Sequence, residues 1–118
     1  MVNENGSKHL SVLFASVSGI SKVGSYSGSA SDVTVTTGFT PRLVLVKKVN
    51  QGAHWQIFDS VRGMGASGND GQMTFNTNAA QDSSKDYVNT TATGFVMKAG
   101  ADGDTNAAGG EYIYYAHA

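Results

Sequence analysis

The sequence predicts an all-β fold, a β-sandwich or jelly-roll-like domain with about eight short antiparallel strands. Apolar residues alternate with polar ones in several short runs, which is the two-residue period of a half-buried strand. Gly, Ser, Thr and Asn are abundant between these runs, and such residues favour turns. No segment shows a sustained apolar period of 3.6 residues, so no long amphipathic helix is expected.

The chain of 118 residues is long enough for one hydrophobic core, and we find no internal repeat, linker or second domain. Residues 1–7 are polar and are expected to form a flexible N-terminal arm. Residues 8–118 are expected to form a single β-sandwich domain.

The first two strands are predicted before residue 30. Residues 8–16 place Leu10, Val12 and Phe14 at alternate positions, which predicts a half-buried strand. The Ser- and Gly-rich stretch that follows has only isolated apolar residues, so a short strand is expected at residues 23–27 between two turns.

A strand, a corner and a second strand are predicted next. Residues 32–37 are rich in Val and Thr and should be extended as far as Gly38. Pro41 has no N–H and disfavours helical angles in the residue before it, so residues 38–41 are expected to turn a corner. Residues 42–49 contain four consecutive aliphatic residues, which predicts a central strand buried on both faces.

Residues 50–53 have a turn signature, and residues 54–61 are expected to pair with the preceding strand. Trp55, Ile57 and Phe58 are its core candidates. Shorter strands are predicted at residues 72–76, 87–91, 94–98 and 111–116. Glycine-rich loops occupy residues 63–71 and 99–110, and the polar residues 77–86 should form one helical turn or cover a sheet edge.

The overall composition excludes several classes of protein. A net charge of −1 gives no basic surface for phosphates, so no nucleic-acid partner is expected. The chain has no Cys, which removes disulfides and thiolate metal sites. No apolar run approaches the roughly 20 residues that cross a bilayer, and the N-terminus lacks the features of a signal peptide. We therefore expect no membrane partner, and synthesis in a cytoplasm without export by the usual route.

Catalytic chemistry is not indicated by the titratable residues. His9, His54 and His117 are far apart, and no Ser or carboxylate lies at a spacing that suggests a triad. Asp59 and Arg62 could form an acid–base pair or an anion clamp, but an ion pair or hydrogen bond at a strand end is favoured. We expect no catalytic residue, no cofactor and no enzymatic activity.

Residues 102–106 place oxygen-bearing side chains at alternate positions, as calcium-binding loops do. The Gly and the bidentate Glu of an EF-hand loop are replaced here by Ala107 and Ile113. An ordinary Asx-rich turn is therefore favoured, and no metal ligand is predicted.

The last predicted strand carries Tyr112, Tyr114 and Tyr115, which should face both sides of a sheet. Core or edge packing is the usual fate of such side chains. Contact with a neighbouring subunit or stacking on a sugar is the alternative, because Tyr is favoured at interfaces.

Several motifs resemble those of a small all-β domain found in structural proteins of tailed bacteriophages, marine ones especially. They are the Gly-Phe-Thr-Pro corner with its following strand at residues 38–47, Trp55 with residues 58–63, the Gly-Phe pair at residues 94–95, and Gly109 with residues 112–116. The match extends over about residues 24–118. The closing strand is Trp-rich in relatives but Tyr-rich here, and the segment after Gly63 is richer in glycine.

This resemblance implies a virion structural protein. Because the chain starts at a Met and holds little besides the domain and a short arm, we expect a capsid decoration (cement) protein that binds and stabilises the assembled shell. Its partner would be the major capsid protein of the phage shell, and it would itself be a homo-oligomer, with a trimer favoured. It would be made in the host cytoplasm and reside in the virion.

The residues that would make these contacts are candidates only. Shell contact is expected from the arm, and subunit contact from the tyrosines; the full set is Val2, Lys8, His9, Leu10, Tyr112, Tyr114 and Tyr115. The alternative is a tail-fibre, appendage or receptor-binding module that recognises carbohydrate through exposed aromatics and the loops at 63–71 and 99–110. A small hydrolase is disfavoured, because no nucleophile and base are suitably spaced.

Overall fold

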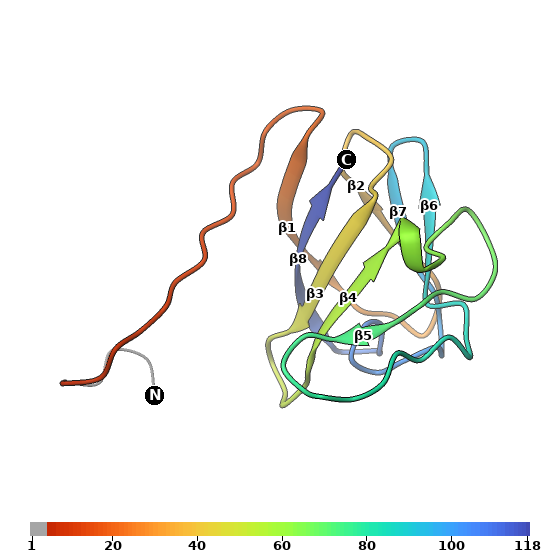
Figure 1. Ribbon diagram of the computed structural model, residues 1–118. Coiled ribbons are helices and arrows are strands. Elements are labelled where there is room, and N and C mark those ends of the chain that lie inside the picture. The colour runs from red at the N-terminus through yellow and green to blue at the C-terminus, as the bar shows by residue number, and fades with distance from the viewer. Residues whose placement is uncertain (1–4) are drawn as a thin grey trace.

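The computed structural model describes residues 5–118 as two antiparallel sheets packed face to face (Figure 1). The strands are β1 (Ser21–Ser27), β2 (Val33–Thr36), β3 (Leu43–Lys48), β4 (Trp55–Asp59), β5 (Met73–Thr74), β6 (Val88–Thr91), β7 (Gly94–Met97) and β8 (Glu111–His117). The larger sheet has the order β1-β8-β3-β4-β5, and the smaller one β2-β7-β6. The first strand thus pairs with the last, and the second with the last but one, which confirms the predicted sandwich with a jelly-roll-like order.

The space between the sheets is filled largely by aromatic rings. The ring of Tyr26 stacks on that of Tyr112 with centroids 4.9 Å apart. Phe95 of the smaller sheet meets Tyr114 edge to face at 5.3 Å, which joins the two sheets directly. Phe58 packs near Tyr87 at 5.9 Å. These contacts place the core between the sheets, as a sandwich requires.

Tyr112 and Tyr114 are therefore core residues, and the prediction that they contact a neighbouring subunit is wrong. They are only 1% and 6% exposed. Both side chains point from β8 toward the smaller sheet, and so does Ala116, because residues two apart share one face of a strand. Burial also raises the pKa of the Tyr114 hydroxyl.

The long loop at residues 99–110 is held by buried tyrosine hydroxyls. The Tyr112 hydroxyl donates to the carbonyl of Gly103 at 2.8 Å and accepts from the amide of Ala107 at 2.9 Å. The Tyr26 hydroxyl donates to the carbonyl of Thr105 at 2.5 Å. The core strands thereby fix the conformation of a loop that has no regular secondary structure of its own.

Residues 8–16 do not form the predicted strand. The amides and carbonyls of Val17 and Ser21 exchange two hydrogen bonds of 2.9 Å, which close a tight turn, but the pairing stops there. The alternation of Leu10 and Val12 is real, but a strand also needs a neighbour that satisfies its backbone. Residues 14–16 still contact the larger sheet, and the chain before them leads away from the sandwich toward its N-terminus (Figure 1).

Two further predicted elements differ in detail. The strand after the turn ends at Asp59, because the Asp59 carboxylate accepts from the amide of Arg62 at 2.9 Å and caps the short 3-10 helix η1 (Ser60–Arg62). Gly63 ends this helix with a left-handed φ of 102°. Residues 77–86 form no helix; they run beside β5, where Gln72 and Asp82 make a bridge that covers the sheet edge.

Candidate interaction surface on the outer sheet face

The larger sheet has a second face, which points away from the smaller sheet and which we call the outer face. Only one side of β3 is fully buried: Val44 and Val46 face the core, whereas Leu43 and Leu45 on the outer face are half-buried. The prediction of burial on both faces of this strand is therefore wrong. The sheet is central in the order of strands, but no second layer covers its outer side within the described residues.

Strand register aligns an apolar row across all five strands of the outer face. Adjacent strands pair Val23 with Tyr115, Tyr115 with Leu45, Leu45 with Ile57 and Ile57 with Met73. Side chains at paired positions of neighbouring strands lie next to one another on the same face. The row is therefore continuous from one sheet edge to the other.

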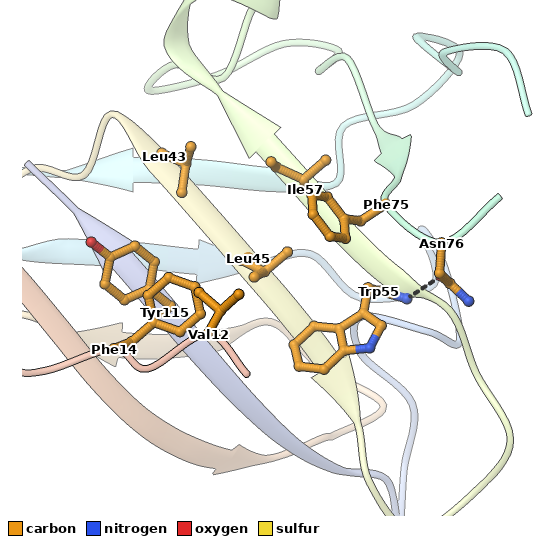
Figure 2. A pocket seen from close by; sticks show the side chains of 9 residues that line it. All are labelled: Val12, Phe14, Leu43, Leu45, Trp55, Ile57, Phe75, Asn76 and Tyr115. Carbon is orange, nitrogen blue, oxygen red and sulfur yellow. Dashed lines mark hydrogen bonds between the residues drawn. The ribbon is translucent and has the colours of Figure 1, made fainter. Parts of the chain in front are cut away.

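A groove of about 610 Å³ lies over this row. It is lined by Val12, Phe14, Leu43, Leu45, Trp55, Ile57, Phe75, Asn76 and Tyr115 (Figure 2). Asn76 is the one amide among these nine residues, and its oxygen already accepts from the backbone amide of Trp55 at 3.0 Å. Phe75 at the rim is 71% exposed. The groove therefore offers aromatic and aliphatic surface with few polar partners.

The chain before β1 contributes the remaining wall of the groove. Phe14 lies against Tyr115 with ring centroids 4.3 Å apart. The segment is anchored just after Phe14, where the Ser21 hydroxyl donates to the carbonyl of Ala15 at 2.8 Å and the Val23 amide donates to the Ser16 hydroxyl at 2.9 Å. We call residues 5–16 the N-terminal segment.

The sequence-predicted contact residues fall into three groups. Lys8, His9 and Leu10 lie on the N-terminal segment and are exposed, Leu10 at 92%. Tyr115 lines the groove. Val2 lies outside the described residues. Only Tyr115 of the three tyrosine candidates thus remains on a surface where it can meet another molecule.

Sequence reasoning missed most of the groove. Trp55 and Ile57 are on the outer face and line the groove, so of the three core candidates in β4 only Phe58 is in the core. The alternation of side chains along a strand could have revealed this. Phe58 lies an odd number of residues after both Trp55 and Ile57, so its side chain must point to the opposite face of the sheet.

The loop residues that suggested calcium take part in protein hydrogen bonds. One Asp102 oxygen accepts from the amide of Asp104 at 2.9 Å, which confirms the Asx turn, and the other accepts from the Gln72 amide group at 2.6 Å. An Asp104 oxygen accepts from the backbone amide of His54 at 3.1 Å. Within residues 5–118, no group of three or more acidic, His or Cys side chains is arranged to hold a metal ion.

The histidines contact separate partners. A ring nitrogen of His54 lies 3.4 Å from the Asn76 side-chain nitrogen, and His117 lies 3.2 Å from the Tyr115 hydroxyl. His9 is exposed on the N-terminal segment. Asp59 and Arg62 form the expected ion pair at the strand end.

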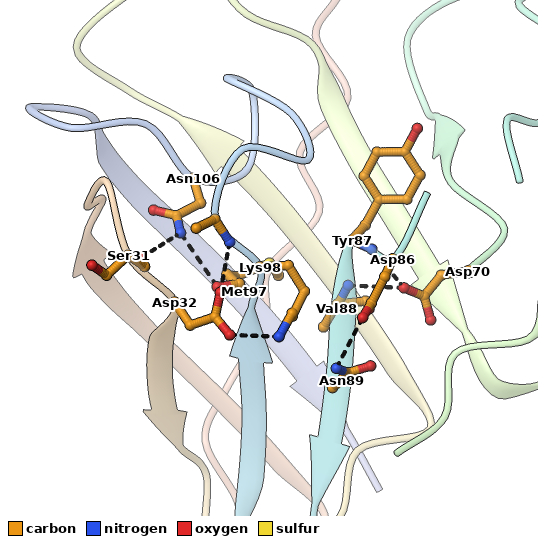
Figure 3. Close-up of polar contacts among 11 residues, drawn as sticks. Ser31, Asp32, Asp70, Asp86, Tyr87, Val88, Asn89, Met97, Lys98 and Asn106 are labelled. Carbon is orange, nitrogen blue, oxygen red and sulfur yellow. Dashed lines mark hydrogen bonds and ion pairs between the residues drawn. The ribbon is translucent and has the colours of Figure 1, made fainter. Parts of the chain in front are cut away.

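A buried carboxylate that the sequence did not reveal joins the loop at residues 63–71 to β6 (Figure 3). One Asp70 oxygen accepts from the amides of Tyr87 and Val88 at 2.8 and 2.9 Å, while the other has no hydrogen-bond partner. Burial raises the pKa of this carboxyl group. Asp86 accepts from the Asn89 amide group alongside. We assign this cluster a structural role, because its hydrogen bonds hold backbone in place.

Together these features define a small β-sandwich that carries an uncovered apolar face, the kind of surface that packs against other proteins. The chain belongs to a family described as a domain of unknown function, DUF7483, whose model matches residues 1–118. No curated protein and no solved structure matches the chain. In the part of the chain that the structure describes, no helix is long and apolar enough to cross a membrane.

Proposed function

We propose that this protein is a bacteriophage virion structural protein, most specifically a capsid decoration protein that binds and stabilises the assembled shell. The resemblance of residues 24–118 to a domain of phage structural proteins supports the phage assignment. The observation that carries a role in assembly, with the shell and with other copies of the chain, is the uncovered apolar surface. Among residues 5–118, eleven large apolar side chains are exposed, and nine of them lie on the N-terminal segment, on the turn at residues 17–20 or on the outer face.

The chemistry of this surface favours a protein partner over a carbohydrate. A sugar would stack on aromatic rings but also needs hydrogen bonds for its hydroxyl groups. Asn76 is the one amide side chain in the groove, and its oxygen is already engaged. This observation ranks the tail-fibre or receptor-binding alternative below the shell-binding role.

Stabilisation of the shell would follow from mass action. A protein that binds only the assembled shell lowers its free energy by RT ln(1 + [L]/Kd), about 2.7 kcal/mol at a hundredfold excess over Kd. Lys8, His9 and Leu10 are the proposed shell contacts among the described residues, since they are exposed beyond the sandwich. The partner would be the major capsid protein, and the decoration protein would act as a homo-oligomer, with a trimer favoured.

The copy number of this protein in purified virions tests the assignment. Quantitative mass spectrometry against the major capsid protein should give hundreds of copies for a shell-decorating protein. A handful to a few dozen copies would instead support the tail-fibre or appendage role. Complete absence from virions would contradict both.

Deletion of residues 2–8 tests the arm. The shortened chain should fold normally, because the described part of this stretch makes no contact with the core, but it should lose binding to shells that lack the protein. Val61→Asp is the matched control, since Val61 is 86% exposed and lies away from both the arm and the groove. Undiminished shell binding by the deletion variant would refute the role of the arm.

A further inference from the structure

The N-terminal segment has the sequence pattern of a strand but makes no strand pairing in the isolated chain. The turn that would join it to β1 is already closed by the hydrogen bonds between Val17 and Ser21. Residues 10–20 carry no charged side chain. An uncharged, strand-like segment that leaves the domain in an extended form has backbone and apolar groups available for another surface.

The two sides of this segment meet different environments. Val12 and Phe14 turn toward the outer face of their own sheet and line its groove (Figure 2). Successive side chains of an extended chain point to opposite sides, so Leu13 points away from that sheet. Leu13 is 93% exposed, and Leu10 further along is 92% exposed. Both leucines therefore lack cover from their own chain.

The groove is covered on one side only. Val12 and Phe14 reach the part near Tyr115, whereas the part formed by Ile57 and Phe75 is open and Phe75 is 71% exposed (Figure 2). Each chain thus carries both an unfilled apolar groove and uncovered leucines. The groove already accepts Val12 and Phe14, which shows that its shape and chemistry suit side chains of this same segment.

We infer that the outer face is the contact between two copies of this chain, with Leu13 of one copy inserted into the open part of the groove of the other. The exchange is self-complementary, since each copy both gives a segment and receives one, as a two-fold contact or a closed ring requires. The nine exposed apolar side chains each expose on the order of 100 Å². Together they offer about the 800 Å² per partner that a stable interface buries.

This inference gives a location to the homo-oligomer of the proposed function, but it does not depend on a virion role. Of the proposed shell contacts, Lys8 lies within residues 2–8, and deletion of these residues leaves Leu13 in place. Loss of shell binding and loss of self-association can therefore be observed separately.

The oligomeric state of the full chain is the first test. Size-exclusion chromatography with light scattering across a dilution series should show an oligomer that Leu13→Asp converts to a monomer. Val61→Asp removes an equally exposed apolar side chain elsewhere, at 86% exposure, and should leave the oligomer intact. Trp55, the single Trp of the chain, lines the groove, so its emission should shift to the blue on association in the wild type and in the control only.

Engineered cysteines test which surfaces meet, and the absence of native Cys makes the readout clean. A Leu13→Cys chain mixed with a Phe75→Cys chain should form a disulfide-linked mixed dimer on oxidation. A Val61→Cys chain mixed with the same Phe75→Cys chain should not.

Three outcomes would overturn the inference. The first is a wild-type chain that stays monomeric at high concentration, and the second is an oligomer that Leu13→Asp leaves unchanged. The third is a chain carrying both Leu13→Cys and Phe75→Cys that cross-links only within itself, which would show that the segment folds back onto its own groove.

Discussion

Replacing Tyr112 by Phe should destabilise the protein, because the hydroxyl group of this core residue anchors the loop at residues 99–110. The side chain is 1% exposed, and its hydroxyl donates to Gly103 at 2.8 Å and accepts from Ala107 at 2.9 Å. Each hydrogen bond contributes about 1 kcal/mol net. Gly103 is exposed, so water can hydrate its carbonyl in the variant. The free energy of unfolding should therefore fall by about the sum of the two hydrogen-bond contributions, about 2 kcal/mol.

Urea unfolding measures this loss directly. With a slope of about 1.5 kcal/mol/M, the midpoint of Tyr112→Phe should fall by roughly 1 M. Tyr115→Phe is the matched control, because its hydroxyl lies at the surface near His117, and it should change stability by less than about 0.5 kcal/mol. Equal midpoints for the two variants would refute the reasoning. Altered association without lost stability would instead support the interface role that the sequence suggested for Tyr112.

Two further substitutions test the packing of the sheets and the buried acid. Gly94→Ala should lower the free energy of unfolding by about 3 kcal/mol, because the added Cβ would overlap the backbone carbonyl of Val35 and push β7 away from β2. Gly52→Ala is the control: nothing lies within 4 Å of its added Cβ, so thermal unfolding should be nearly unchanged. Burial raises the pKa of Asp70, so the native state keeps this proton to a higher pH than the unfolded chain does. The stabilisation that comes from this proton is complete below the pKa of Asp70 in the unfolded chain. It is lost as the pH rises through the pKa of Asp70 in the native state. Asp70→Asn removes the titration, so wild type should lose stability relative to the variant as the pH rises above about 4, the ordinary pKa of an Asp. A difference in urea unfolding that stays constant with pH would contradict the assignment.

A feature of the fold could be predicted from the sequence when it depends on only a few neighbouring residues. The corner at Gly38 was predictable because Gly and Pro act on their own backbone angles, and Gly38 indeed has φ 91°. The bounds of β5 were not, because a strand lasts only as long as its neighbour does, and β5 pairs with β4 over two residues only. Residues 8–16 failed for the same reason: their alternation is a local property, but the strand that should satisfy their backbone is missing from the isolated chain.

The candidate surface shows the same division between local and long-range information. The Tyr-rich closing strand was recognisable from sequence, but which of its rings would face outward was not, because either parity of a strand can face the core. The pairing of β8 between β1 and β3 decided this by placing Tyr115 beside Leu45 and Val23. The groove draws its walls from residues as distant as Phe14 and Tyr115, so no short motif could have revealed it.

The sequence alone therefore determined the all-β class, most strands and the turns, since alternation and turn residues act over a few positions. Tertiary structure decided the rest: the order of strands, the burial of Tyr112 and Tyr114, and the exposure of Trp55 and Ile57. These properties depend on pairings between segments far apart in the chain, whose energies are set by packing and backbone hydrogen bonds that no single segment contains.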